Sequence, residues 1–123
     1  MHHSPTFLKL VDDAKTRVRE VTVDETLARL KANQGAKLID TREDNEWHAG
    51  HAAGALHIGK GIIERDIEAR VPDKAAEIIL YCGGGFRSAL AGDVLQQMGY
   101  TNVTSMAGGW RAWNELGAPV ERG

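Results

Sequence analysis

The segment "EIILYCGGGFRSALAGDVLQQMGY", residues 77–100, holds the most apolar run of the chain and its only cysteine. Residues 77–82 are apolar and β-branched through their middle, which predicts a central strand covered on both faces. The three glycines that follow predict a flexible loop, and residues 87–98 predict a helix with one apolar face. Cys82 therefore lies where a strand gives way to a loop and a helix. The apolar face of that helix is formed by Leu90, Val94, Leu95 and Met98.

Short apolar strands and amphipathic helices alternate along the rest of the chain. Thr22 and Glu25 have the spacing of a capping box and predict the start of one helix. The alternation predicts an α/β fold, a mainly parallel sheet with helices on both faces. Ligands in such folds bind beyond the carboxyl ends of the strands, which is where Cys82 lies. The predicted strands are residues 36–41, 55–58, 77–82 and 102–106, and the predicted helices are residues 7–18, 22–31, 43–50, 62–70, 87–98 and 108–116.

Composition narrows the classes of function. The chain has 123 residues, enough for one domain with one core, and 42% hydrophobic and 26% charged residues are typical of globular proteins. A net charge of −2 without a long block of one sign gives no support to nucleic acid or a membrane as partner. We find no signal-peptide pattern, and one cysteine cannot form an internal disulfide. These features predict a cytoplasmic location.

The loop "CGGGFR", residues 82–87, suggests nucleophilic chemistry. Glycines take positive φ without steric cost, so the backbone N–H groups can turn inward and form an anion-binding nest. The start of the following helix adds partial positive charge. These surroundings favour a thiolate, which is the nucleophilic form, and an anionic adduct such as a persulfide. We predict that Cys82 is the catalytic nucleophile; the alternative is an inert buried cysteine beside ordinary turn glycines.

Metal binding explains these residues less well. The chain has no second cysteine, and His48 and His51 are separated by Gly50, which is expected to break the helix on which they would form a ligand pair. No general base adjoins Cys82 in the sequence, because Tyr81 precedes it. We expect no metal, and activation of the thiol by the loop amides.

Three segments of the chain together resemble the single-domain rhodaneses, a family of sulfurtransferases. The resemblance runs from about Val21 to Val120 and implies a five-stranded, largely parallel sheet. It divides the chain into an N-terminal helical extension, residues 1–20, and a rhodanese-like domain, residues 21–123. The matching segments are "LIDTREDNEWHAGHAAGALHI" at 38–58, "YCGGGFRSALAGDVLQQMGY" at 81–100 and "VTSMAGGWRAW" at 103–113.

The resemblance implies a double-displacement reaction without a cofactor or metal. A donor such as thiosulfate or a persulfide would place its outer sulfur on Cys82. A thiophilic acceptor, cyanide or a cellular thiol, would then remove it. The substrate-binding loop whose amides would cradle the persulfide is formed by Gly83, Gly84, Gly85, Phe86 and Arg87.

Asp40 and Arg42 match the family's D-x-R pattern at the end of the first strand. We expect Asp40 to be structural and to accept backbone N–H bonds in nearby turns. We expect Arg42 to bind substrate by lining the mouth of the pocket, or to pair with Glu46. The other family positions are expected to serve packing and turn geometry: His51, Gly54 and residues 108–110.

The loop length separates this chain from related phosphatases. Their loop between cysteine and arginine is longer by one residue than the loop from Cys82 to Arg87, and a histidine usually precedes their cysteine. The shorter loop suits a sulfur-sized anion, so we expect no phosphatase or arsenate chemistry. The loop also lacks the cation that suits thiosulfate in some rhodaneses. We therefore expect thiosulfate to be a donor only in vitro. An anionic substrate would be attracted by Lys60, Arg65 or Arg87, unless these residues are solvated surface charges.

Two functions of different classes remain open. The first is a sulfurtransferase that turns over small donors at Cys82. The second is a persulfide carrier or redox-sensing interaction module that serves a protein partner, since an exposed reactive thiol suits either role. The glycine-only loop and residues 1–20 motivate the second function. Residues 7–18 would then dock a partner or form a dimer, although we expect them to pack against their own domain.

Overall fold

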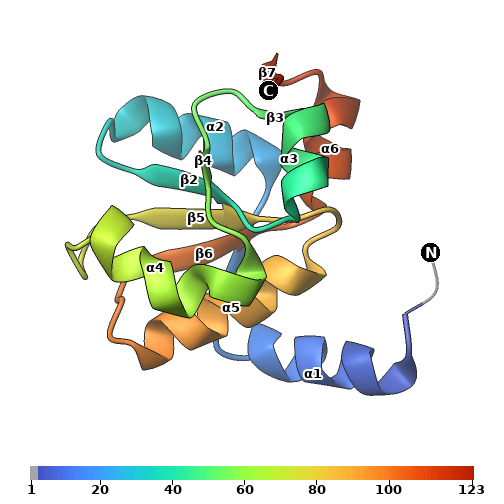
Figure 1. The fold of residues 1–123 in the computed structure, drawn as a ribbon, viewed down its shortest axis with the longest axis vertical. Coiled ribbons are helices and arrows are strands. Elements are labelled where there is room, and N and C mark those ends of the chain that lie inside the picture. Colours follow the sequence, from blue (N-terminus) through green and yellow to red (C-terminus); the bar gives the residue numbers. More distant parts are fainter. Residues whose placement is uncertain (1–2) are drawn as a thin grey trace.

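The computed structural model describes residues 3–123 and shows a sheet between two layers of helices (Figure 1). The sheet has five strands in the order β1-β6-β5-β2-β4, and all neighbouring strands are parallel. The predicted α/β fold is confirmed. The elements are α1 (Pro5–Lys15), β1 (Arg19–Val21), α2 (Val23–Ala32), β2 (Lys37–Asp40), α3 (Asp44–Ala49), β3 (His51–Ala52), β4 (Leu56–His57), a 3-10 turn (Lys60–Ile62), α4 (Ile63–Arg70), β5 (Ile78–Tyr81), α5 (Phe86–Gln97), β6 (Val103–Met106), α6 (Gly109–Leu116) and β7 (Val120–Glu121).

Strand β5 runs through the centre of both cores. Ile78 and Leu80 belong to the core under α4 and α5, and Ile79 and Tyr81 belong to the core under α2 and α6. All four side chains are completely buried. Successive side chains of a strand point to opposite faces, so a strand covered on both sides needs an uninterrupted apolar run. This is the pattern from which the central strand was predicted.

Helix α5 is buried more broadly than its predicted apolar face. Of the four residues predicted to face the core, only Leu95 is fully buried. Small residues fill the other contacts, because the sheet covers one side of the helix and α1 covers the other. A methyl group on Gly92 would lie 2.9 Å from Cγ1 of Val18, so glycine allows the segment after α1 to approach closely. The buried small residues are Ser88, Ala89, Ala91 and Gly92.

Helix α1 packs against its own domain, along α5 (Figure 1). Val11 and Ala14 are buried, and Arg17 donates two hydrogen bonds to the carboxylate of Asp93 on α5, at 2.8 and 2.9 Å. Ser4 caps the start of the helix: its hydroxyl oxygen accepts a hydrogen bond from the backbone N–H of Phe7 at 3.1 Å. These contacts fix α1 as a third layer outside α5.

The boundary predicted between residues 1–20 and the domain falls inside β1. Arg19 and Glu20 pair with Thr104 and Ser105 of β6, so they are part of the sheet. The first two residues of the predicted extension lie outside the described residues. None of the helices in residues 3–123 has the length and apolarity needed to span a membrane.

Local sequence patterns predicted most helices and strands, but several short strands were not predicted. The capping box of Thr22 and Glu25 forms as predicted, with both reciprocal hydrogen bonds present. Strand β1 was not predicted, and neither was the antiparallel pair of β3 with β7, in which His51 faces Glu121. Strands of two or three residues are too short to show an alternating pattern.

The buried contact between α1 and α5 predicts the effect of Val11→Ala. Val11 is completely buried, so losing two methyl groups and leaving a cavity should lower the free energy of unfolding by about 2 kcal/mol. Urea denaturation measures this change. Leu10→Ala is the matched control, because its side chain is 58% exposed, and it should change stability by less than about 0.5 kcal/mol. Equal effects of the two substitutions would show that α1 does not pack as described.

Candidate active site

Cys82 directly follows β5 at the carboxyl edge of the sheet, and α5 begins four residues later. Of the three loop glycines, only Gly85 has a positive φ, 96°. A methyl group there would also lie 3.3 Å from the backbone nitrogen of Gly108. The backbone conformation thus requires glycine only at Gly85, whereas the sequence suggested this requirement for all three glycines.

Hydrogen-bond donors surround the sulfur of Cys82. The Gly85 N–H lies 3.2 Å from Sγ, the Ser88 N–H lies 3.4 Å away, and the Ser88 hydroxyl lies 3.5 Å away. Gly85 is the N-cap of α5 and offers no capping side chain, so Sγ accepts the hydrogen bond that a capping oxygen normally takes. Ser88 also bonds to Ser105 through its hydroxyl, at 2.8 Å. The sulfur is buried among donors, and the contribution of Ser88 was not predicted.

The start of α6 holds the other side of the loop. The Trp110 N–H donates to the carbonyl oxygen of Cys82 at 2.7 Å, and the Arg111 N–H donates to that of Gly83 at 3.2 Å. Gly109 has a φ of 50°, and any side chain there would collide with the Cys82 carbonyl. The predicted packing and turn role of residues 108–110 is confirmed.

Several loop amides lack a hydrogen-bond partner among the described residues. With two carbonyls held by α6, the loop turns amide groups away from it. Bonds to an anion would satisfy these donors and the helix start together. Within residues 3–123, no hydrogen-bond partner is found for the N–H groups of Gly83, Gly84, Phe86 and Arg87.

A cavity of about 730 Å³ opens over Cys82. Four of the predicted substrate-binding residues line it, whereas Gly85 points its amide at the sulfur instead. Helix α1 contributes to the wall, which the sequence did not reveal. The lining residues are His3, Phe7, Glu46, Cys82, Gly83, Gly84, Phe86, Arg87 and Arg111.

Arg87 pairs with Glu46 of α3 through two contacts, Nη1 to Oε1 at 2.9 Å and Nη2 to Oε2 at 3.3 Å. The hydrogen bond from Arg87 lowers the pKa of Glu46 below its ordinary value of 4.5. Glu46, and to a smaller extent Cys82, raise the pKa of Arg87. The pair ties α3 to the start of α5, and it places a neutralised arginine beside the sulfur.

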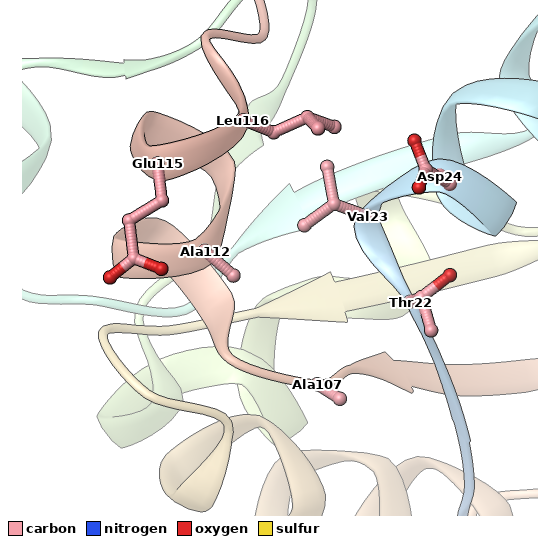
Figure 2. Close-up of a pocket in the computed structure, with 7 residues that line it drawn as sticks. All are labelled: Thr22, Val23, Asp24, Ala107, Ala112, Glu115 and Leu116. Atoms are coloured by element: carbon pink, nitrogen blue, oxygen red, sulfur yellow. The ribbon is translucent and has the colours of Figure 1, made fainter.

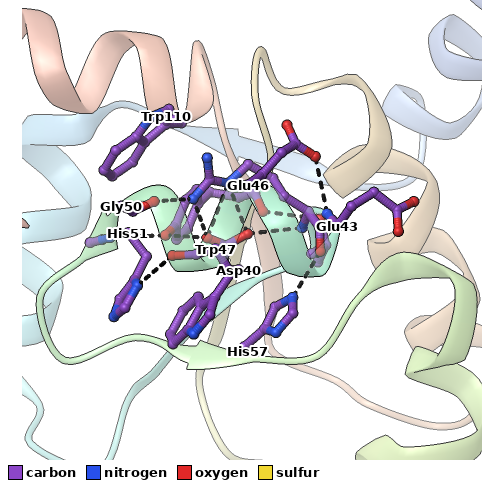
Figure 3. A network of polar contacts seen from close by, with 12 residues as sticks. Asp40, Glu43, Glu46, Trp47, Gly50, His51, His57 and Trp110 are labelled. Atoms are coloured by element: carbon purple, nitrogen blue, oxygen red, sulfur yellow. Dashed lines mark hydrogen bonds and ion pairs between the residues drawn. The ribbon is translucent and has the colours of Figure 1, made fainter. Parts of the chain in front are cut away.

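Arg42 has a different place from the one predicted. Its Nη2 donates to Asp40 at 2.8 Å and to the Gly50 carbonyl at 2.6 Å, and its guanidinium lies 4.6 Å from the ring centroid of Trp110. Figure 3 labels these three partners. The side chain is 3% exposed and does not line the cavity. The predicted pairing with Glu46 is wrong, because a buried guanidinium needs acceptors close to it, and Asp40 and the Gly50 carbonyl supply them.

Asp40 is structural, as predicted. It accepts the backbone N–H of Arg42 at 2.8 Å and the hydroxyl of Tyr81 at 2.6 Å. Burial raises the pKa of Tyr81 and keeps its phenol protonated as a donor. The same hydroxyl oxygen accepts the N–H of Ala52 at 3.0 Å. The ends of β2 and β5 are thereby joined to β3.

The histidines near this network pack rather than face the sulfur. His51 stacks on Trp47 with ring centroids 3.4 Å apart, and its Nδ1 lies 2.9 Å from the Trp47 carbonyl (Figure 3). His57 stacks on Trp47 at 4.9 Å. Among residues 3–123, no group of three or more His, Cys, Asp or Glu side chains is placed to hold a metal ion. Lys60 and Arg65 do not line the cavity.

A second hollow of about 420 Å³ lies between the start of α2 and the segment that runs from the end of β6 through α6 (Figure 2). It contains two carboxylates, Asp24 and Glu115, and an exposed Leu116, but no cysteine, histidine or cation. The cavity over Cys82 is therefore the candidate active site.

The family model of the Rhodanese-like domain matches residues 22–116. The chain belongs to this family. It is 34% identical to the senescence-associated protein DIN1 of Raphanus sativus over 119 residues, which cover 89% of this chain and 64% of the relative. It is also 34% identical to the thiosulfate sulfurtransferase GlpE of Pseudomonas fluorescens over 86 residues, covering 70% and 77%. The chain spans about three-fifths of the plant relatives that it matches.

Solved structures agree with this assignment. The polysulfide-sulfur transferase homodimer of Wolinella succinogenes has a TM-score of 0.83 and 26% identity, over 96% of this chain and 88% of that one. A protein of unknown function from Rhodopseudomonas palustris, described as a possible tyrosine phosphatase, has a TM-score of 0.81 and 26% identity, over 98% and 99%. Family and relatives support a sulfur-transfer role in general.

The Arg87–Glu46 pair predicts a pH-dependent contribution to stability. The pKa of Glu46 is lowered on folding, so the pair stabilises the protein above the ordinary value of 4.5 and the stabilisation is lost as the pH falls through the lower folded pKa. Glu46→Gln should cost about 1 kcal/mol at neutral pH and progressively less in acid. Urea denaturation from pH 7 to pH 3 measures the difference. Glu64→Gln, on the exposed side of α4, is the control. A difference in the free energy of unfolding between the wild type and Glu46→Gln that grew in acid would contradict this account.

Proposed function

We propose that this chain is a sulfurtransferase that carries a sulfane sulfur as a persulfide on Cys82. The observation that supports this proposal is the set of donors around the sulfur. The amides of Gly85 and Ser88 bond to Sγ, and four further loop amides, of residues that line the cavity, have no partner among the described residues. Such a ring stabilises a negative charge on the sulfur and on an atom attached to it.

In the first step the thiolate of Cys82 attacks the outer sulfur of the donor. With thiosulfate, the bond between the two donor sulfurs breaks, its electron pair leaves on sulfite, and Cys82 becomes a persulfide anion. In the second step an acceptor nucleophile, a thiolate or cyanide, attacks the outer sulfur. The sulfur–sulfur bond to Cys82 breaks, and the electron pair returns to the cysteine thiolate.

The surrounding residues hold charge and exclude competing reactions. The Ser88 hydroxyl and the two amides stabilise the thiolate before loading and after release. The free amides of the loop would receive the outer sulfur, and Arg87, paired with Glu46, lines the cavity beside them. A free thiol of this kind needs a reducing compartment such as the cytoplasm to stay available.

Phosphate chemistry fits the site less well. A phosphoryl group needs an arginine fork free to bind its oxygens, whereas both terminal nitrogens of Arg87 are engaged by Glu46. The one acidic side chain that lines the cavity is Glu46 itself, so none of the lining carboxyls is left to protonate a leaving group. The likeness to a possible tyrosine phosphatase is therefore a likeness of fold and loop position.

The proposal is tested by intact-protein mass spectrometry after incubation with thiosulfate or with an inorganic polysulfide. We expect a mass increase of about 32 Da, one sulfur atom, which cyanide or a thiol then removes. Cys82→Ser is the control and should gain no mass. Loading that persists in Cys82→Ser, or failure of every donor to load the wild type, would overturn the proposal.

A turnover assay with the same small donors and acceptors separates an enzyme from a carrier. A sulfurtransferase should complete many cycles with small donors and acceptors, since the cavity admits both from solvent. A persulfide carrier should load and then discharge quickly only to its protein partner. Both outcomes require the Cys82 persulfide, so they differ in turnover and not in the adduct.

A further inference from the structure

We infer that the cavity over Cys82 is built for an organic persulfide with a carboxylate, of the peptidic thiol class, and that Phe7 and Arg111 select it. This inference rests on the proposed sulfur transfer and names its donor. The donor would bind with its reacting sulfur at Cys82, its carbon skeleton against Phe7, and its carboxylate at Arg111.

The volume of the cavity favours a large donor. It measures about 730 Å³, and pockets of roughly 300–1,000 Å³ hold drug-sized organic ligands. Thiosulfate is comparable to only a few water molecules, each taking about 30 Å³ of the liquid. A small inorganic anion would leave most of this space to water, so the size of such an anion does not account for the volume of the cavity.

An aromatic wall covers the side of the cavity formed by α1 and α5. The rings of Phe7 and Phe86 have centroids 6.4 Å apart, and the ring of His3 lies 4.6 Å from Phe86. Ring faces bind carbon skeletons and peptide planes, and they offer nothing to a bare oxyanion. The wall is fixed to the domain, because Arg17 and buried Val11 hold α1 on α5.

Arg111 provides an available cation at the rim of the cavity. Arg87 and Glu46 neutralise each other. The Arg111 side chain is 77% exposed, and its carboxylate neighbour among residues 3–123, Glu115, lies 4.0 Å away and is itself 73% exposed. An exposed pair at this distance holds the guanidinium weakly. Arg111 can therefore bind a carboxylate of the donor by charge-assisted hydrogen bonds.

The transfer balances with this donor. The thiolate of Cys82 attacks the terminal sulfur of the protonated persulfide. The sulfur–sulfur bond of the donor breaks, and its electron pair leaves on the donor's inner sulfur as a thiolate. Cys82 then carries the terminal sulfur with its proton, and no oxidant or reductant takes part.

The test compares three donors: glutathione persulfide, the persulfide of glutathione diethyl ester, and thiosulfate. Loading of Cys82 is followed by mass spectrometry and gives kcat/KM for each donor. The variants are Phe7→Ala and Arg111→Gln. Leu10→Ala is the matched control for the first, on the exposed side of the same helix, and Arg65→Gln is the control for the second, outside the cavity. Thermal melting confirms that each variant is folded.

We expect the wild type to load faster from glutathione persulfide than from thiosulfate. Arg111→Gln should lower kcat/KM about fivefold for glutathione persulfide and less than about twofold for the ester, which lacks the carboxylates. Phe7→Ala should lower it about tenfold for both organic donors and leave thiosulfate within about twofold. The two control variants should behave as the wild type with all three donors.

Equal losses with all three donors, or no loss in either variant, would overturn the inference. Loading from thiosulfate with no loading from the organic donors would overturn it and leave the sulfur-transfer proposal intact. Failure of all small donors to load the wild type would overturn both the inference and the sulfur-transfer proposal. A mass gain of one sulfur atom that persists in Cys82→Ser would also remove the sulfur-transfer proposal.

Discussion

The hydrogen bond from the Trp110 N–H to the carbonyl oxygen of Cys82, at 2.7 Å, is the contact on which the site depends. A peptide loop can turn its amides in one direction only if its carbonyls find partners in the other. The start of α6 provides those partners for Cys82 and Gly83, and the absence of a side chain at Gly109 makes the approach possible. The result is a sulfur held in a ring of donors at the end of the most buried strand.

A buried charge pair keeps the start of α6 in place. Arg42 pairs with Asp40 at the end of β2, and its guanidinium lies 4.6 Å from the centroid of the Trp110 ring. Tyr81 joins the same carboxylate from β5, one residue before the cysteine. Charges buried so deeply are stable only when every partner is present, so the pair fixes one arrangement of strand ends and helix. Arg42 thus acts on the site through structure, and the charged residues that reach the cavity are Arg87, Glu46 and Arg111.

Local sequence predicted the structural features that depend on residues close together in the chain. The apolar run before Cys82 located the central strand, and the glycines located the loop. Contacts between distant segments had no such signal. Arg42 was expected to line the pocket or to pair with Glu46, yet Glu46 bonds to Arg87, 41 residues away, and Arg42 bonds to Asp40. Phe7 reaches the cavity only because α1 lies along α5, and Ser88 faces the sulfur only because α5 begins at Phe86.

The most direct test of the account is an amide NMR spectrum of the protein before and after loading of Cys82 with sulfur. Amide protons that gain a hydrogen bond to a charged sulfur move downfield. The account predicts that the largest shifts belong to loop amides between Gly83 and Ser88, and that Cys82→Ser shows none under the same treatment. Shifts confined to the cavity rim, with the loop amides unchanged, would show that the backbone does not carry the charge of the persulfide.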